Sequence, residues 1–116
     1  GVDDWSLVWG ARLPLPTVEG LVSVVKADSY RVVDRSGVIC AIGMFETATI
    51  GDAGFVVAEL ANWVASSPPA AQAVVTQLGE TTVQLVSCDP GADAAVTPQR
   101  AAVDALISRQ VGRLAI

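Results

Sequence analysis

The chain of 116 residues contains no histidine, and this absence excludes more chemistry than any other feature of its composition. Histidine is the side chain that titrates nearest neutral pH, so the commonest general acid and base is missing. Neither a Ser-His-Asp triad nor a Cys-His pair can be built from this chain alone. Zinc sites use histidine or several cysteines, and the chain has only 2 cysteines, so a zinc site is not expected either.

Positive charge is also scarce. The chain carries 7 basic and 12 acidic side chains, for a net charge of −5, and Lys26 is its one lysine. Binding to nucleic acid needs clustered lysine and arginine, and no such cluster occurs here. Arg31 and Arg35 are close in sequence, but Asp28 and Asp34 lie beside them. Arg100, Arg109 and Arg113 near the C-terminus are interpreted as part of a solvated helix face. Nucleic acid is therefore not an expected partner.

Long apolar runs are missing although 52% of the residues are apolar. That content excludes a disordered chain, and no run reaches the roughly 18 to 20 apolar residues of a transmembrane helix. No secretory signal peptide is visible, and the sequence does not begin with methionine. We expect residues 1–116 to form a single globular domain that is a fragment or a processed part of a longer protein.

The two cysteines lie in segments that predict neighbouring strands. Cys40 sits in the apolar run Val38–Ile42, and Cys88 ends the run Val83–Cys88. We predict a disulfide between them, which would stabilise the fold by roughly 4 kcal/mol through closure of a loop of about 49 residues. A disulfide indicates an extracytoplasmic setting, whether periplasmic, cell-envelope or secreted. Two buried thiols are the alternative, and they would fit a cytoplasmic protein.

The first half of the chain predicts strands. Trp5, Leu7 and Trp9 alternate with Ser6, Val8 and Gly10, which has the period of a half-buried strand. The prolines at 14 and 16 would end this strand. Asp34-Arg35-Ser36-Gly37 predicts a turn. The expected strands span residues 5–13, 21–27, 30–33 and 38–45.

The second half predicts helices around one further strand. We expect a helix capped by Asp52, a short helix over Ala70–Leu78, a strand over 81–88, and a helix beginning at Thr97-Pro98. The last helix carries an apolar stripe formed by Val103, Leu106, Ile107, Val111 and Leu114. The fold class is therefore α+β, with a two-layer, mainly antiparallel or mixed sheet and about three helices packed on one face. The sheet would be mixed if 38–45 and 81–88 were joined by a crossover.

Candidate sites are few. Trp5, Leu7 and Trp9 share one face of their predicted strand, which is either core or, on an edge strand, an interaction surface. Glu46, Asp52 and Glu59 are the carboxylates that a carboxylate-dependent enzyme would use. Each also has a structural explanation, Glu46 in a strand, Asp52 as a helix cap and Glu59 on a helix. Asp89 and Asp93 flank Pro90-Gly91, which predicts a turn rather than a calcium loop. No phosphate-binding loop appears, so we expect no catalytic residues, metal or cofactor.

These absences favour a non-catalytic protein-interaction or assembly domain, bound to a partner protein or to a second copy of itself. Many alanines and valines with a single lysine are typical of a GC-rich bacterial genome. We therefore predict a bacterial cell-envelope or secretion-associated protein. The first alternative is a domain that binds a small apolar ligand between its layers. The second is a carboxylate-dependent enzyme.

Overall fold

The computed structural model describes residues 2–91, and only the backbone of residues 2 and 3. The helix predicted from Thr97 and the loop residue Asp93 lie outside these residues. The described elements are, in chain order, α1 (Val2–Gly10), α2 (Leu15–Val24), β1 (Val25–Arg35), β2 (Val38–Thr47), α3 (Ile50–Ala65), the 3-10 turn η1 (Pro69–Ala71), β3 (Val74–Gln77) and β4 (Thr82–Cys88).

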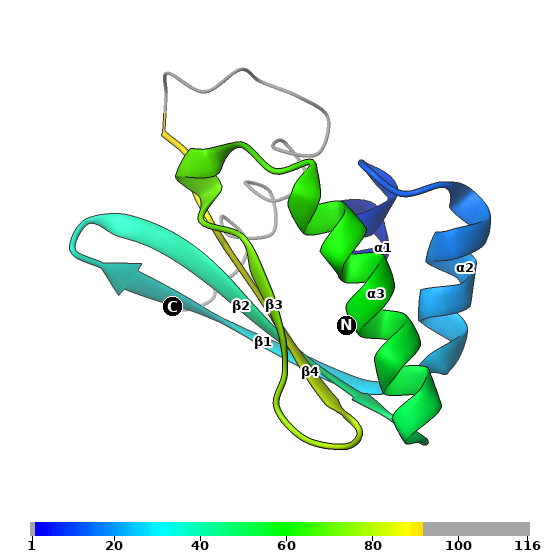
Figure 1. The fold of residues 1–116 in the computed structure, drawn as a ribbon. Helices are drawn as coiled ribbons and strands as arrows, with labels where there is room; N and C mark the ends of the chain where they lie inside the picture. The colour runs from blue at the N-terminus through cyan, green and yellow to red at the C-terminus, as the bar shows by residue number, and fades with distance from the viewer. Residues whose placement is uncertain (1, 92–116) are drawn as a thin grey trace.

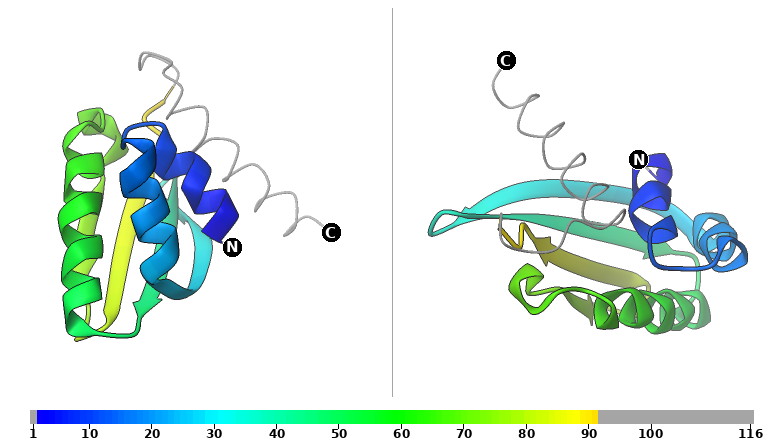
Figure 2. Two further views of the ribbon diagram at one scale, coloured as in Figure 1. Left: turned by 90° about the vertical axis from the view of Figure 1, so that its right-hand side faces the viewer. Right: turned by 90° about the horizontal axis from the view of Figure 1, so that it is seen from above.

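The four strands form one sheet in the order β1-β2-β4-β3, and each neighbouring pair is antiparallel. The helices α1, α2 and α3 cover one face of this sheet (Figure 1). Seen edge-on, α3, α2 and α1 follow one another across the sheet from the side of β3 towards β1 (Figure 2). The predicted α+β fold with helices packed on an antiparallel sheet is confirmed.

The hairpin of β1 and β2 turns where the sequence predicts it. Arg35 pairs with Val38, which leaves Ser36 and Gly37 as the two turn residues. Both have positive φ, 56° and 89°, as the tightest hairpin turns require. The Asp34 carboxylate accepts a hydrogen bond from the Gly37 N–H at 2.7 Å.

The strand predicted over residues 5–13 is wrong, because residues 5–10 belong to α1 and a turn follows over 11–13. Trp5 and Trp9 are four residues apart, a spacing that fits one face of a helix as well as one face of a strand. The residues between them decide the outcome, since a strand would bury Leu7 and expose Val8. In the structure Leu7 is 63% exposed and Val8 is 1% exposed, which is the helical pattern.

The strand predicted over 21–27 is also wrong for its first four residues, which belong to α2. Its β-branched residues favour a strand by propensity, but Val18, Leu21 and Val25 are buried at helical spacing. Packing of this face outweighs propensity, as it commonly does. Pro16 falls in the first turn of α2, where its missing N–H removes no helical hydrogen bond.

The helix predicted after Ile50 is present as α3, and its buried face includes Val56, Leu60 and Trp63. Its N-terminus differs from the prediction. Thr49 is the N-cap, and its hydroxyl accepts a hydrogen bond from the Asp52 N–H at 3.0 Å. Asp52 lies in the first turn, where its negative charge is favourable for the helix dipole.

The helix predicted over Ala70–Leu78 is wrong: η1 occupies three residues and β3 follows. The β-branched residues Val74 and Val75 join a hairpin with β4, the strand predicted at 81–88. Because β3 takes the sheet edge, β4 returns between β2 and β3 and runs antiparallel to β2. A crossover connection that made β2 and β4 parallel neighbours would have given a mixed sheet. The two strands are instead antiparallel, so this alternative is wrong.

The core lies between the helices and the sheet and is rich in large aromatic rings. Trp9, Phe45 and Trp63 have no exposed surface, and Trp5 is 2% exposed. The Trp5 ring meets Phe45 edge-on, with 5.1 Å between the ring centroids. The Trp63 Nε1–H donates to the Val8 carbonyl at 2.8 Å, which ties α3 to α1.

Candidate functional site: a groove between α1 and α2

An open, mostly apolar groove lies between α1 and α2. Its volume is about 480 Å³, and its lining residues are Ser6, Gly10, Leu13, Leu15, Val18, Glu19, Val22 and Ser23. Leu15 is 68% exposed and Val22 is 38% exposed. Leu7, which lies one turn before Gly10 on α1, is also exposed but does not line the groove. Contiguous exposed apolar surface of this kind is typical of an interaction site.

Arg12, in the turn between α1 and α2, fixes the end of the groove to α3. Its Nη1 donates a hydrogen bond to the Trp63 carbonyl at 2.8 Å and another to the Ser67 hydroxyl. The guanidinium also lies over the Trp63 ring, 4.0 Å from the centroid. Burial lowers the pKa of the Arg12 guanidinium from its ordinary value to about 10, so it remains a cation at neutral pH.

Replacing Arg12 with alanine is expected to destabilise the fold by about 1 to 2 kcal/mol, because a charged donor and a cation–π contact are lost. Urea unfolding followed by tryptophan fluorescence measures this change. Arg35→Ala is the control, since Arg35 is exposed at the end of β1. It should change the free energy of unfolding by less than about 0.5 kcal/mol. Equal losses for the two variants would show that Arg12 does not connect the turn to α3.

The three residues predicted to share one surface, Trp5, Leu7 and Trp9, lie on different faces of α1. Trp5 and Trp9 point into the core and offer almost no surface, whereas Leu7 is 63% exposed. The groove residues Leu15, Val18 and Val22 were not predicted as a site. Their spacing of three and four residues is the helical signal that could have identified them. The prolines at 14 and 16 obscure this signal, because proline also marks the end of a strand.

The predicted disulfide between Cys40 and Cys88 is confirmed. The two residues lie directly opposite each other on β2 and β4. The Asp89 N–H donates to the Ile39 carbonyl at 2.8 Å, so the cysteines form a non-hydrogen-bonded pair, the kind that brings Cα atoms closest. They lie on the sheet face opposite the helices, together with Ile42 and Val86.

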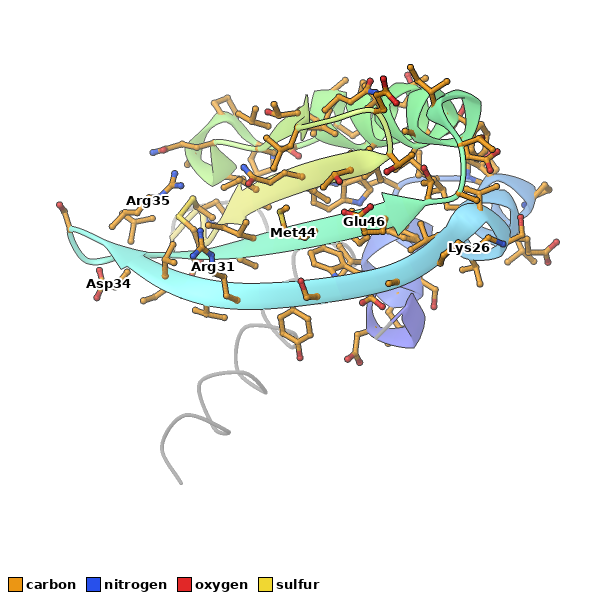
Figure 3. The ribbon with its side chains drawn as sticks, turned by 90° about the horizontal axis from the view of Figure 1, so that it is seen from below. Lys26, Arg31, Asp34, Arg35, Met44 and Glu46 are labelled. Atoms are coloured by element: carbon orange, nitrogen blue, oxygen red, sulfur yellow. A yellow bond between two sulfur atoms is a disulfide. The ribbon has the colours of Figure 1, made fainter. Side chains whose placement is uncertain are left out.

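The candidate carboxylates do not converge. Glu46 lies on the helix-free face of the sheet with Met44 (Figure 3), where it accepts hydrogen bonds from the hydroxyls of Thr81 and Thr82. Asp52 and Glu59 lie on α3, on the other side of the sheet. The Asp89 carboxylate accepts from the Gly91 N–H at 3.0 Å, which is the hydrogen bond of a turn. Over residues 2–91, no three acidic or cysteine side chains are grouped to hold a metal ion.

No protein-family model matches the chain, and comparison with curated proteins and with solved structures gives no match. Within the described part of the chain, no helix has both the length and the apolar content needed to span a membrane.

Proposed function

We propose that this domain is a non-catalytic protein-interaction domain and that the groove between α1 and α2 holds an amphipathic helix of a partner protein. The exposed apolar lining of the groove is the observation that carries this proposal. Apolar residues at helical spacing on a partner can fill such a groove with successive anchors. Full burial of one leucine or valine side chain contributes about 1.5 to 3 kcal/mol.

Charge indicates the kind of helix that fits. Residues 1–91 contain ten acidic and four basic side chains, which gives a net charge of −6. Glu19 lines the groove, and Asp3 and Asp4 lie at the start of α1. A partner helix with lysine or arginine beside its apolar stripe would match this surface, because complementary charge speeds association and favours the correct partner.

We place this function outside the cytoplasm, in a bacterial cell-envelope or secretion-associated protein. The disulfide between Cys40 and Cys88 supports an oxidising setting. The abundance of alanine and valine supports a bacterial source with a GC-rich genome.

Leu15→Ser is expected to weaken the binding of a basic amphipathic peptide roughly tenfold, because one apolar anchor loses its contact. The probe is an 18-residue helical peptide of leucine and lysine, titrated against the full chain and followed by amide NMR shifts. Shifts should concentrate at Ser6, Gly10, Glu19 and Ser23.

Ile50→Ser is the matched control for this experiment. Leu15 and Ile50 are each the first residue of a helix, and they are 68% and 63% exposed. The control should change affinity less than about twofold, because Ile50 does not line the groove. A leucine–glutamate peptide of the same length should bind at least fivefold more weakly. Equal weakening by both variants, or shifts spread over the whole surface, would contradict the proposal.

A small apolar ligand is the other class of occupant, since the groove volume of about 480 Å³ falls within the usual range for ligand pockets. A dansylated fatty acid tests it directly. Saturable one-to-one binding of this probe, with no response to either peptide, would replace the proposed function with ligand binding.

A further inference from the structure

The two edges of the sheet are built differently. Edge strands of natural proteins are protected from pairing with other chains by charged side chains, proline or a bulge. The edge strand β1 has a bulge between Val25 and Ala27, and its eleven residues include five charged side chains. The other edge strand, β3, has the sequence Val-Val-Thr-Gln and pairs with β4 in regular register, without charge, proline or bulge. The β3 edge therefore has none of these protections against pairing.

The alternation of backbone groups along β3 shows which of them point away from the sheet. The Leu78 N–H donates to a carbonyl of β4 at 2.9 Å. Because backbone direction alternates along a strand, Thr76 and Val74 also direct their N–H and C=O groups to β4. The N–H and C=O groups of Val75 and Gln77 therefore point outward, where an added strand can pair with both residues.

The hydrophobic core is incompletely closed at this edge. Val75 of β3 and Val57 and Val64 of α3 are only partly buried, although they pack against the main hydrophobic cluster. On the helix-free face, Val74 and Leu78 are 52% and 51% exposed. A strand added to β3 would cover apolar side chains on both faces of the sheet.

The helix α3 lies over β3, as the left view of Figure 2 shows. Its Phe55 ring faces α2, since a Cβ atom on Gly20 of α2 would lie 3.2 Å from the Phe55 Cζ atom. On an ideal helix, the flank about 140° away from Phe55 faces the free edge of the sheet. This outer flank of α3 is uncharged and consists of Gly54, Val57, Ala61 and Val64.

We propose that the β3 edge binds an extended segment of a partner protein as a fifth strand beneath the outer flank of α3. Hydrogen bonds to the outward groups of Val75 and Gln77 would hold its backbone, and its alternate side chains would contact the two apolar surfaces. Because the strand and the flank carry no charge, the segment is uncharged and rich in β-branched residues. The outer flank and α2 lie on opposite sides of α3, so this surface is separate from the α1–α2 groove.

A second copy of this chain does not fit the β3 edge as this strand. Antiparallel pairing of two β3 strands about a two-fold axis places both α3 helices on the same side of the joined sheet. Each α3 lies over its own β3, so the helix axes would be about 5 Å apart, the spacing of neighbouring strands. Packed helices need about 8 to 10 Å. The occupant is therefore a strand with no helix above it.

The probe that tests this proposal is a ten-residue peptide of alternating valine and threonine with a glutamine at each end, titrated against the full chain. Without peptide, amide hydrogen exchange should be fast at Val75 and Gln77 and slow at Thr76, whose N–H faces β4. Saturating peptide should slow exchange at Val75 and Gln77 at least about tenfold. The same peptide with N-methylated backbone amides should have no effect, because it cannot pair with a strand edge.

Two substitutions at one position separate the backbone from the side chain. Gln77→Pro removes an outward N–H but no hydrogen bond to β4, and proline is tolerated on edge strands. It should weaken peptide binding roughly tenfold, the effect of one lost hydrogen bond. Gln77→Ala is the matched control, which keeps the N–H and should change affinity less than about twofold. Slow exchange at Thr76 in both variants shows that β3 remains paired with β4.

A second pair of variants tests the outer flank without altering β3. Ala61→Glu places a charge on the flank and should weaken peptide binding at least about fivefold, whereas Ala58→Glu, on the solvent side of α3, should not. Equal effects within either pair of variants would overturn the proposal. Protection at β1 in place of β3, or dimerisation of the chain without peptide through the β3 edge, would also overturn it. None of these results depends on the α1–α2 groove.

Discussion

Replacing both Cys40 and Cys88 with alanine is expected to lower the free energy of unfolding by about 4 kcal/mol. The disulfide joins residues 48 positions apart, so its loss frees the unfolded chain from a large closed loop. Domains of this size unfold with a free energy of about 5 to 15 kcal/mol, so the variant would be marginally stable. The midpoint of thermal unfolding should fall by roughly 15 to 30 °C.

Calorimetry of the oxidised protein, the reduced protein and the double variant measures this effect. The reduced protein and the double variant should unfold at similar temperatures, because both lack the covalent link. Protein taken from its native compartment should resist thiol alkylation until it is reduced. A change of less than 1 kcal/mol on reduction would contradict the stabilising role of the bridge, and two alkylated thiols would contradict the extracytoplasmic setting.

Gly43→Ala should cost about 2 to 3 kcal/mol, because the core has no room for one more methyl group at this position. A Cβ atom on residue 43 would lie 2.8 Å from the Trp5 Cη2 atom and 2.9 Å from the Phe45 Cζ atom. Trp5 lies in α1, so the added methyl would push this helix away from β2. Urea unfolding measures the loss, and near-ultraviolet circular dichroism reports the changed tryptophan packing.

Two further variants separate this close contact from a general effect of removing glycine. Gly54→Ala should stabilise the protein by about 0.5 to 1 kcal/mol, because Gly54 lies within α3 with open space around its Cα atom. Trp5→Phe should rescue Gly43→Ala, since the smaller ring leaves the space that the methyl needs. A double-mutant cycle with a coupling energy near zero would show that the Trp5 ring does not limit the size of the side chain at position 43.

The elements predicted correctly are those whose local signals agree with one another. Asp34 and Gly37 define the hairpin turn, and the run around Cys40 is an unambiguous strand. Trp63 lies on a stripe of apolar residues that have the spacing of a helix, and apolar residues do not alternate there as they would in a strand. The pairing of Cys40 with Cys88 followed from two predicted strands and an even cysteine count, without any knowledge of their register.

The N-terminal helices could not be predicted in this way, because their signals conflict. Residues 5, 9 and 13 fit a strand and a helix equally well, and only the burial of Val8 distinguishes the two. In α2 the β-branched residues favour a strand, and helix formation depends on packing against partners distant in sequence. The groove arises from the approach of α1 to α2, so the sequence contained no local signal for its shape.

The measurement that tests the interaction function most directly is site-specific photocrosslinking in the organism that produces the protein. Benzoylphenylalanine replaces Leu15 or Val22 in the groove, and Ile50 or Val38 as controls that are also exposed. We predict that the two groove positions crosslink to a basic amphipathic helix of one partner protein and that the controls do not. Equal crosslinking at all four positions, or none at the groove, would contradict the account.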